Sequence, residues 1–237
     1  MRIPEDLITK GKELEHIGLF ENTEPFVDIA RACSGILIQL YESPNVPRED
    51  PQALVRLGVA ILLNKIEHEL LPAGIHLMIR DAWRTPATQA GIHENQAIQI
   101  EQLGLAKDRE EARIQADKYA VRPDDWRPPP HTTGGAVDVT LAFASGKQLF
   151  MRKEFKDCTP EEWQAQKARD YQNLSAEILK NRRMLREAME AVGFASIPNE
   201  WWHFSYGEFW WAARTDRKRT LYLSVPKPLC VLSMELK

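Results

Sequence analysis

Two short segments of the sequence concentrate metal-binding side chains next to glycines and aromatic residues. The first, PHTTGGAVDV, carries His131 and Asp138, and the second, NEWWHF, carries Glu200 and His203. Imidazole and carboxylate groups are common zinc ligands, and three protein ligands with one open position are typical of catalytic zinc sites. If His131, Asp138 and His203 converge, the sequence predicts such a site, with Glu200 as a spare carboxylate beside it.

The local sequence around each segment indicates how these groups are positioned. Two glycines follow His131 and permit a tight bend, and Asp138 alternates with valines as in a half-buried strand, on the face opposite to them. In a regular strand, Glu200 and His203 would point to opposite faces because they are three positions apart. Their pairing therefore requires a bend near Pro198–Asn199, or a bulge.

The wider sequence predicts a mixture of strands and helices that position these segments. Strands are expected at 25–29, 35–41, 75–79, 136–143, 202–206 and 220–225, and helices opening at Asp50-Pro51 and Thr85-Pro86 and covering about 109–119, 160–172 and 174–192. Arg84 lies where a strand is followed by a helix. Because strands and helices follow no strict βαβ order, the expected fold class is α+β.

Length, composition and net charge indicate a globular protein and argue against some classes of partner. The 237 residues are expected to form one domain, 1–237. With 43% hydrophobic and 27% charged residues, the chain is expected to fold into a globular structure. The formal net charge of -3 argues against a nucleic-acid partner, since binding to phosphates requires a positive field.

Cysteine content and hydropathy indicate the cellular compartment in which the protein is expected. Cys33, Cys158 and Cys230 are odd in number and far apart, so neither a disulfide framework nor a paired-cysteine zinc site is expected. Core packing, or no role, is the expectation for them. No segment has the features of a secretory signal or the apolar length of a membrane span. The sequence therefore predicts a cytoplasmic protein with no membrane partner.

Each motif also has an ordinary structural interpretation. A histidine among tryptophans is often a hydrogen-bonded core residue, and an aspartate near glycines is often a turn cap. The pairs beginning at His68 and His93 lack the second histidine of His-Glu-x-x-His. The tryptophans in Trp201–Trp211 could form a partner surface, although Gly207–Glu208 and Arg214–Arg219 are typical of a solvated turn.

Taken together, the segments resemble the zinc-dependent D-alanyl-D-alanine dipeptidases, relatives of the D,D-carboxypeptidases and of the hedgehog signalling domain. The family pattern Ser-x-His-x-x-Gly-x-Ala-x-Asp aligns with the segment from Pro129 to Asp138, with Pro129 in place of the serine. The family's Glu-x-Trp-His aligns with the segment from Glu200 to His203. Its arginine turn resembles DAWRTP, which contains Arg84. The three motifs occur in the family's order.

The resemblance implies an α+β fold of the hedgehog/D,D-peptidase type, with a small antiparallel sheet flanked by helices. It implies one zinc ion per chain held by His131, Asp138 and His203. Glu200 would serve as general base for the attacking water, and Arg84 would stabilise the oxyanion. The implied reaction is hydrolysis of the dipeptide D-Ala-D-Ala, either to salvage D-alanine or to limit the supply of cell-wall peptidoglycan precursors.

Two alternatives stay open at this point. A D,D-carboxypeptidase would remove the terminal D-alanine from a longer peptidoglycan peptide and would have an open cleft. A catalytically silent protein would keep zinc for structure and use its tryptophan-rich end as a binding module. Pro129 removes a hydroxyl group near the site, which concerns substrate anchoring more than metal chemistry. The residues that pair with the substrate termini and the oligomeric state are not assigned by the sequence.

Overall fold

The computed structural model describes residues 14, 16–41, 45–46, 49, 52–117, 120–122, 125 and 127–236. The helices are α1 (Ile29–Ala32), α2 (Leu57–Lys65), α3 (Pro86–Gln102), α4 (Arg109–Ala116), α5 (Pro160–Ala165), α6 (Ala176–Ala191) and α7 (Phe209–Arg214), with a π-helical turn η2 (Ile66–Leu70) and 3₁₀ turns η3 (Pro130–Thr133) and η4 (Phe155–Asp157). The strands are β1 (Phe26–Asp28), β2 (Leu37–Ile38), β3 (Leu54–Arg56), β4 (Ile75–Asp81), β5 (Ala136–Phe143), β6 (Ala195–Ser196), β7 (His203–Ser205) and β8 (Val231–Leu232). This mixture confirms the α+β fold. The single domain expected for 1–237 stays a prediction.

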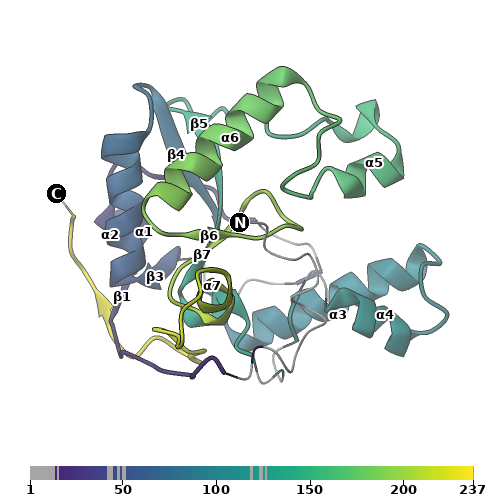
Figure 1. Cartoon of the computed structure of the whole chain (residues 1–237), viewed down its shortest axis with the longest axis horizontal. Coiled ribbons are helices and arrows are strands. Elements are labelled where there is room, and N and C mark those ends of the chain that lie inside the picture. The colour runs from purple at the N-terminus through teal and green to yellow at the C-terminus, as the bar shows by residue number, and fades with distance from the viewer. Residues whose placement is uncertain are drawn as a thin grey trace.

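A five-stranded sheet forms the centre of the molecule, with strand order β2-β4-β5-β7-β6. Every pair in it is antiparallel except the parallel pair formed by the edge strand β2 with β4. Helix α6 lies across β4 and β5 (Figure 1), and its Leu185 and Met189 pack in the same core as Val137 and Val139 of β5. A second sheet, β3-β1-β8, adjoins this core.

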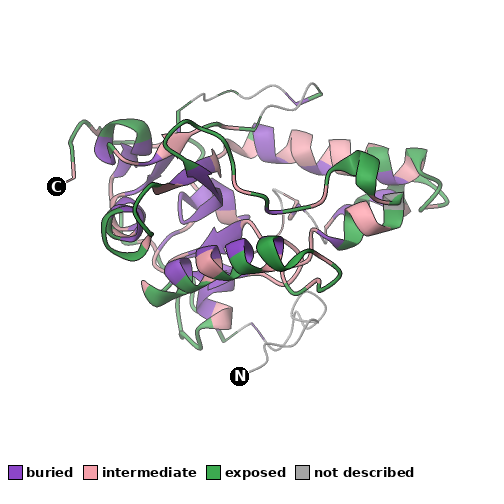
Figure 2. Ribbon diagram, turned by 90° about the horizontal axis from the view of Figure 1, so that it is seen from above, coloured by how far each residue is buried: buried purple, intermediate pink, exposed green. Residues whose placement is uncertain are grey.

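Helices α3 and α4 pair with each other and extend, like α5, away from the two sheets (Figure 1). Buried residues gather in the strands and on the inner faces of the helices, whereas the helices farthest from the C-terminus are mostly exposed or partly exposed (Figure 2). None of the helices in the described part of the chain combines the length and the apolar composition that crossing a bilayer requires.

Most of the expected elements are confirmed, and several helices begin at residues whose side chains cap them. Strands occur within all of the first five expected ranges, and β5 covers the expected range completely. The side chains of Thr85, Asp108, Thr159 and Ser175 accept backbone N–H groups at the starts of α3, α4, α5 and α6. Gly193, just after α6, has a φ of 99°, which favours glycine.

The helix expected to open at Asp50-Pro51 differs from the structure. Those two residues lie outside the described part, but Leu54–Arg56 forms strand β3, and the helix begins only at Leu57. Strand β3 pairs antiparallel with β1, which places Val55 opposite Val27. An extended segment is favoured because all three residues of β3 are buried and their backbone groups pair with a neighbouring strand.

The strand expected at 220–225 is wrong. The N–H groups of Leu221 and Tyr222 both donate to the carbonyl oxygen of Gly207, at 2.6 and 3.0 Å. Successive N–H groups of a strand point in opposite directions, so two of them cannot serve one carbonyl in a ladder. Tyr222 is instead buried in the main core.

Two helices end earlier than expected. Helix α5 ends well short of residue 172 because the guanidinium of Arg182 binds the carbonyl oxygens of Gln166 and Ala168, at 2.7 and 3.2 Å. Those contacts hold the chain in a non-helical path. Helix α4 ends a few residues short of 119, and residues 118–119 lie outside the described part.

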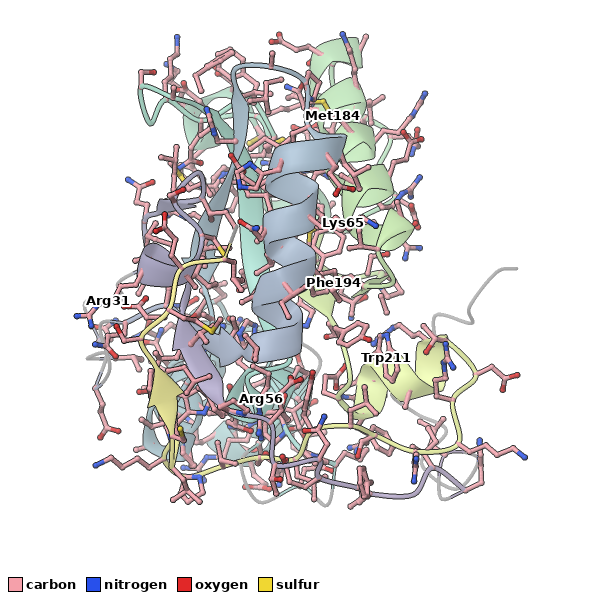
Figure 3. The ribbon with its side chains drawn as sticks, turned by 90° about the vertical axis from the view of Figure 1, so that its left-hand side faces the viewer. Arg31, Arg56, Lys65, Met184, Phe194 and Trp211 are labelled. Carbon is pink, nitrogen blue, oxygen red and sulfur yellow. The ribbon has the colours of Figure 1, made fainter. Side chains whose placement is uncertain are left out.

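The solvated turn expected at Gly207–Glu208 is also wrong. Glu208 is 0% exposed, and its carboxylate caps α7 by accepting the backbone N–H groups of Trp210 and Trp211, at 2.7 and 2.5 Å. The indole of Trp211 packs inward and donates to the carbonyl oxygen of Gly193 at 2.9 Å (Figure 3). Because both tryptophans are buried, they do not form an exposed partner surface.

The three cysteines are unpaired. Cys33 is buried in the main core, Cys158 is partly buried and Cys230 is exposed. The expectation of core packing is therefore confirmed for Cys33 alone.

Candidate active site

The register of three neighbouring strands places acidic and imidazole side chains side by side. Asp138 of β5 lies opposite Asp81 of β4 on one side and opposite His203 of β7 on the other. A register shift in β4 between Ile79 and Asp81 precedes this row. The central strand thus brings together residues far apart in the sequence.

His131 reaches the same place from the η3 turn, and the bend expected after it is confirmed. Gly134 ends this turn with a φ of 74°, and a Cβ atom there would lie 2.3 Å from the ring of Phe26. At Gly135, a Cβ atom would lie 2.4 Å from the carbonyl oxygen of Tyr206. Both positions therefore require glycine, since any larger residue would displace the turn that holds His131.

The three predicted ligands converge. His131 Nε2 lies 3.2 Å from Asp138 Oδ1 and 3.2 Å from His203 Nδ1, and the latter two atoms are 3.0 Å apart. Ligand atoms at ~2.0–2.1 Å from a tetrahedral zinc ion are ~3.3 Å apart. The three side chains form a cluster of a size that can hold a metal ion, and their donor atoms fit zinc.

Hydrogen bonds on the far side of each imidazole orient the two rings. His131 Nδ1 donates to the carbonyl oxygen of Ala82 at 2.8 Å, which leaves the lone pair of its Nε2 facing the cluster. His203 Nε2 lies 3.0 Å from the hydroxyl oxygen of Ser205, which in turn is hydrogen-bonded to Glu208. If this hydroxyl donates to Glu208 and accepts from His203, Nδ1 of His203 is also free to bind a metal.

The electrostatics of the cluster favour the ionisation states that bind metals. Burial lowers the pKa of His203 to about 4, although the hydrogen bond and charge of Asp138 oppose this. Burial alone would raise the pKa of Asp138, but the charges and hydrogen bonds of His131 and His203 hold it well below its usual value. At neutral pH the site therefore presents a neutral His203 and an ionised carboxylate.

Glu200 lies beside this cluster without belonging to it. The bend expected at Pro198–Asn199 is present, and a turn follows before β7, so that Glu200 Oε2 comes within 4.0 Å of His203 Nδ1. Burial and, next, the charge of Asp138 raise the pKa of Glu200 to about 8. A carboxylate with so high a pKa is a good proton acceptor near neutral pH.

The guanidinium of Arg84 lies beside the carboxylates of Asp81 and Asp138. Its Nε and Nη2 bind Asp81 Oδ2, each at 2.7 Å, Nη1 donates to Gln89 at 3.2 Å, and Nη2 lies 3.5 Å from Asp138 Oδ2. The backbone N–H of Arg84 also donates to the carbonyl oxygen of His131 at 3.2 Å. Arg84 is therefore a positioned charge within the site and not a surface salt bridge.

A cavity of about 930 Å³ opens onto these residues. His131, Asp138, His203, Glu200 and Arg84 all line it. The structure thus brings together all five residues singled out in the sequence.

Sequence reasoning missed several residues of this site. Asp81 belongs to the same DAWRTP motif as Arg84, so its position in that motif was a usable signal. Ser205 and Glu208 had no such signal, because their contacts with His203 arise from the strand and the following cap. Lys167 also lines the cavity, and its positive charge favours the ionised form of Glu200.

Comparison with known proteins identifies the family of this chain. The model of a family described as D-ala-D-ala dipeptidase matches residues 47–218, which include the whole site. The chain belongs to this family. A D-alanyl-D-alanine dipeptidase of Synechocystis sp. is 38% identical over 97 residues. That match spans 38% of this chain and 39% of the length of the relative.

Two solved structures are also similar to this member of the D-Ala-D-Ala dipeptidase family. One is the vancomycin-resistance D,D-pentapeptidase VanY in complex with Zn(II), at 13% identity and a TM-score of 0.44, covering 81% of this chain and 88% of that one. The other is VanYB in complex with D-alanine-D-alanine, at 14% identity and a TM-score of 0.42, covering 73% and 82% of the two chains.

Proposed function

We propose that this chain is a zinc-dependent D,D-peptidase that hydrolyses D-Ala-D-Ala to two D-alanines. The observation that carries the proposal is the triangle of His131 Nε2, Asp138 Oδ1 and His203 Nδ1, with edges of 3.0 to 3.2 Å, next to the buried Glu200. Membership of the dipeptidase family supports the choice of substrate. The cytoplasmic location expected from the sequence stays a prediction.

His131, Asp138 and His203 would hold the ion. When bound, zinc supplies Lewis-acid catalysis, which polarises the carbonyl and makes water acidic enough to attack at neutral pH. Glu200 accepts the proton of the water as its oxygen forms a bond with the carbonyl carbon of the peptide. When the C–N bond breaks, its electron pair goes to the amine nitrogen, and Glu200 returns the proton there.

Arg84 contributes a fixed positive charge to this reaction. Negative charge develops on the carbonyl oxygen as water adds, and a guanidinium held in place before the reaction can stabilise it without reorganisation. Asp81 and Gln89 supply that restraint through their hydrogen bonds to Arg84. A purely structural zinc protein would have no need for a base and an oxyanion donor on one cavity, which disfavours the binding-module alternative.

The decisive experiment measures D-alanine release from D-Ala-D-Ala by zinc-loaded protein, with a chelated sample as control. We expect release from the dipeptide that chelation abolishes and that added zinc restores. Absence of release from any D-Ala-D-Ala-terminated substrate would contradict the proposal and favour the binding module.

The cavity volume supports a second candidate, a D,D-carboxypeptidase. A dipeptide spans at most about 7 Å, whereas the cavity of about 930 Å³ extends to Phe155 and Trp163 on one side and to Ile92 and Gln99 of α3 on the other. A longer peptide would fit this volume. The same assay with a peptidoglycan pentapeptide decides between the two, because a dipeptidase releases D-alanine from the dipeptide alone.

Replacing Ser205 with alanine is expected to weaken zinc binding by roughly 10- to 100-fold, because His203 loses the hydroxyl that orients its ring. Competition with a chromophoric chelator measures this affinity. Ser145, in the exposed turn after β5, offers the matched control Ser145→Ala, for which we expect wild-type affinity. Equal affinities for Ser205→Ala and the wild type would rule out this orienting role.

At pH 6.5, zinc binding is expected to release about one proton per ion more from the wild type than from Glu200→Gln. The pKa of Glu200, raised to about 8 by burial and by Asp138, means that this carboxyl group is protonated before the metal binds. The charge of the ion then displaces the proton, whereas His203, with a pKa of about 4, has none to lose. Calorimetry in buffers of different ionisation enthalpy counts the protons. Equal release by the wild type and Glu200→Gln would contradict the assignment.

A further inference from the structure

Buried polar atoms without a hydrogen-bond partner gather around the cavity. Among the described residues they are Thr140 Oγ1, Trp201 Nε1, both Nε and Nη1 of Arg214, and Asn64 Oδ1. All but Asn64 belong to residues that line the cavity. Buried polar groups in folded proteins are nearly always hydrogen-bonded. Their concentration here indicates where a polar ligand completes the missing bonds.

Arg214 is the charged member of this group. It is the last residue of α7, and its guanidinium lies 5.6 Å from the ring centre of Trp210, another residue of the cavity wall. The nearby carboxylate of Glu208 is occupied by the N–H groups of Trp210 and Trp211. Burial lowers the pKa of Arg214 to about 10, so that it still carries its charge at neutral pH.

Other cations of the cavity wall are already engaged. Three of them pair with carboxylates: Arg84 with Asp81, Arg127 with Asp125, and Lys153 with Glu162. Arg80 donates to the side-chain oxygen of Gln39. Arg152 is exposed and stacks on Trp163, and Lys167 acts on Glu200 through its charge. Arg214 is therefore the cation of the wall best able to take up an anion.

The place of Arg214 relative to the metal cluster also matters. Its side chain lines the same cavity as His131, Asp138 and His203, so that one small substrate in the cavity can contact both Arg214 and the cluster. In any D,D-peptide substrate, the leaving residue carries a free carboxylate a few bonds from the scissile peptide. A guanidinium matches a carboxylate in charge and in planar fork geometry.

We propose that Arg214 binds the free carboxylate of the substrate's terminal D-alanine. This inference rests on the proposed function and deepens it, because the same carboxylate is present in the dipeptide and in longer peptides. With the carboxylate bound at Arg214, the rest of the cavity is left for the amino-terminal side of the substrate. Arg214 thereby sets specificity for a free carboxyl terminus.

The test compares hydrolysis of D-Ala-D-Ala with that of its C-terminal carboxamide. We expect the wild type to prefer the free acid. Arg214→Met is expected to raise KM for the acid by roughly 10- to 100-fold, the range for a hydrogen bond between charged groups, with little change in kcat or in the kinetics of the amide. Arg217→Met is the matched control, because Arg217 is exposed and stacks on Trp211 outside the cavity wall. This variant should behave as the wild type.

The alternative role of Arg214 is to balance the charge of buried Glu208. In that case Arg214→Met would lower stability and reduce the hydrolysis of acid and amide equally, which would overturn the proposal. If Arg214→Met does not fold, Arg214→Gln is the second variant. A raised KM for the acid with unchanged kinetics for the amide supports the proposal, and an unchanged KM for the acid refutes it. If the wild type hydrolyses neither substrate, the proposed function itself fails.

Discussion

Glu200→Ala is expected to lower kcat/KM for D-Ala-D-Ala by roughly 10²- to 10⁴-fold while leaving zinc binding intact. The carboxylate lies 4.0 Å from His203 Nδ1 and is not a member of the ligand cluster, so its loss removes the proton acceptor and not the metal. Steady-state hydrolysis and metal content of the same protein preparation provide the two readouts.

The matched control for this variant is Glu187→Ala, on the exposed side of α6. We expect wild-type activity and wild-type zinc content for it. Equal activity of Glu200→Ala and the wild type would refute the general-base role. Loss of zinc from Glu200→Ala would instead show that Glu200 is a ligand, and the assignment of the cluster would have to change.

His203→Ala is expected to lose zinc and activity together. His203 supplies one of three donor atoms, and even the removal of a group that only orients a ligand typically costs 10- to 100-fold in affinity, so we expect a loss greater than about 100-fold. Zinc at 100 times its Kd stabilises the folded wild type by about 2.7 kcal/mol. His203→Ala should show no such zinc-dependent increase in its free energy of unfolding.

His68→Ala is the control for this experiment, because His68 is exposed on η2. It should bind zinc and respond to it as the wild type does. Persistent zinc-dependent stabilisation of His203→Ala would argue that the ion binds elsewhere. Together, His203→Ala and Glu200→Ala distinguish the residues that bind the metal from the residue that transfers the proton.

The sequence was sufficient for features that depend on a few neighbouring residues. The caps at Thr85, Asp108 and Thr159 and the glycine bend after His131 follow from local hydrogen bonding and backbone freedom, and all are present. The strand expected at 220–225 failed because the carbonyl of Gly207, not a neighbouring strand, accepts the N–H groups of both Leu221 and Tyr222. Local composition carries no information about such a partner.

The types of the site residues and the order of their motifs along the chain also predicted that His131, Asp138 and His203 converge. Only the tertiary structure decided that they do, because His131 and His203 are 72 residues apart. The register of β5 and β7 places Asp138 opposite His203, and the η3 turn before β5 brings His131 to both. A shift of one residue in that register would turn Asp138 to the other face of the sheet. The environments of Ser205 and Arg214 likewise exist only after packing, since burial and long-range contacts determine which polar groups acquire hydrogen-bond partners and which do not.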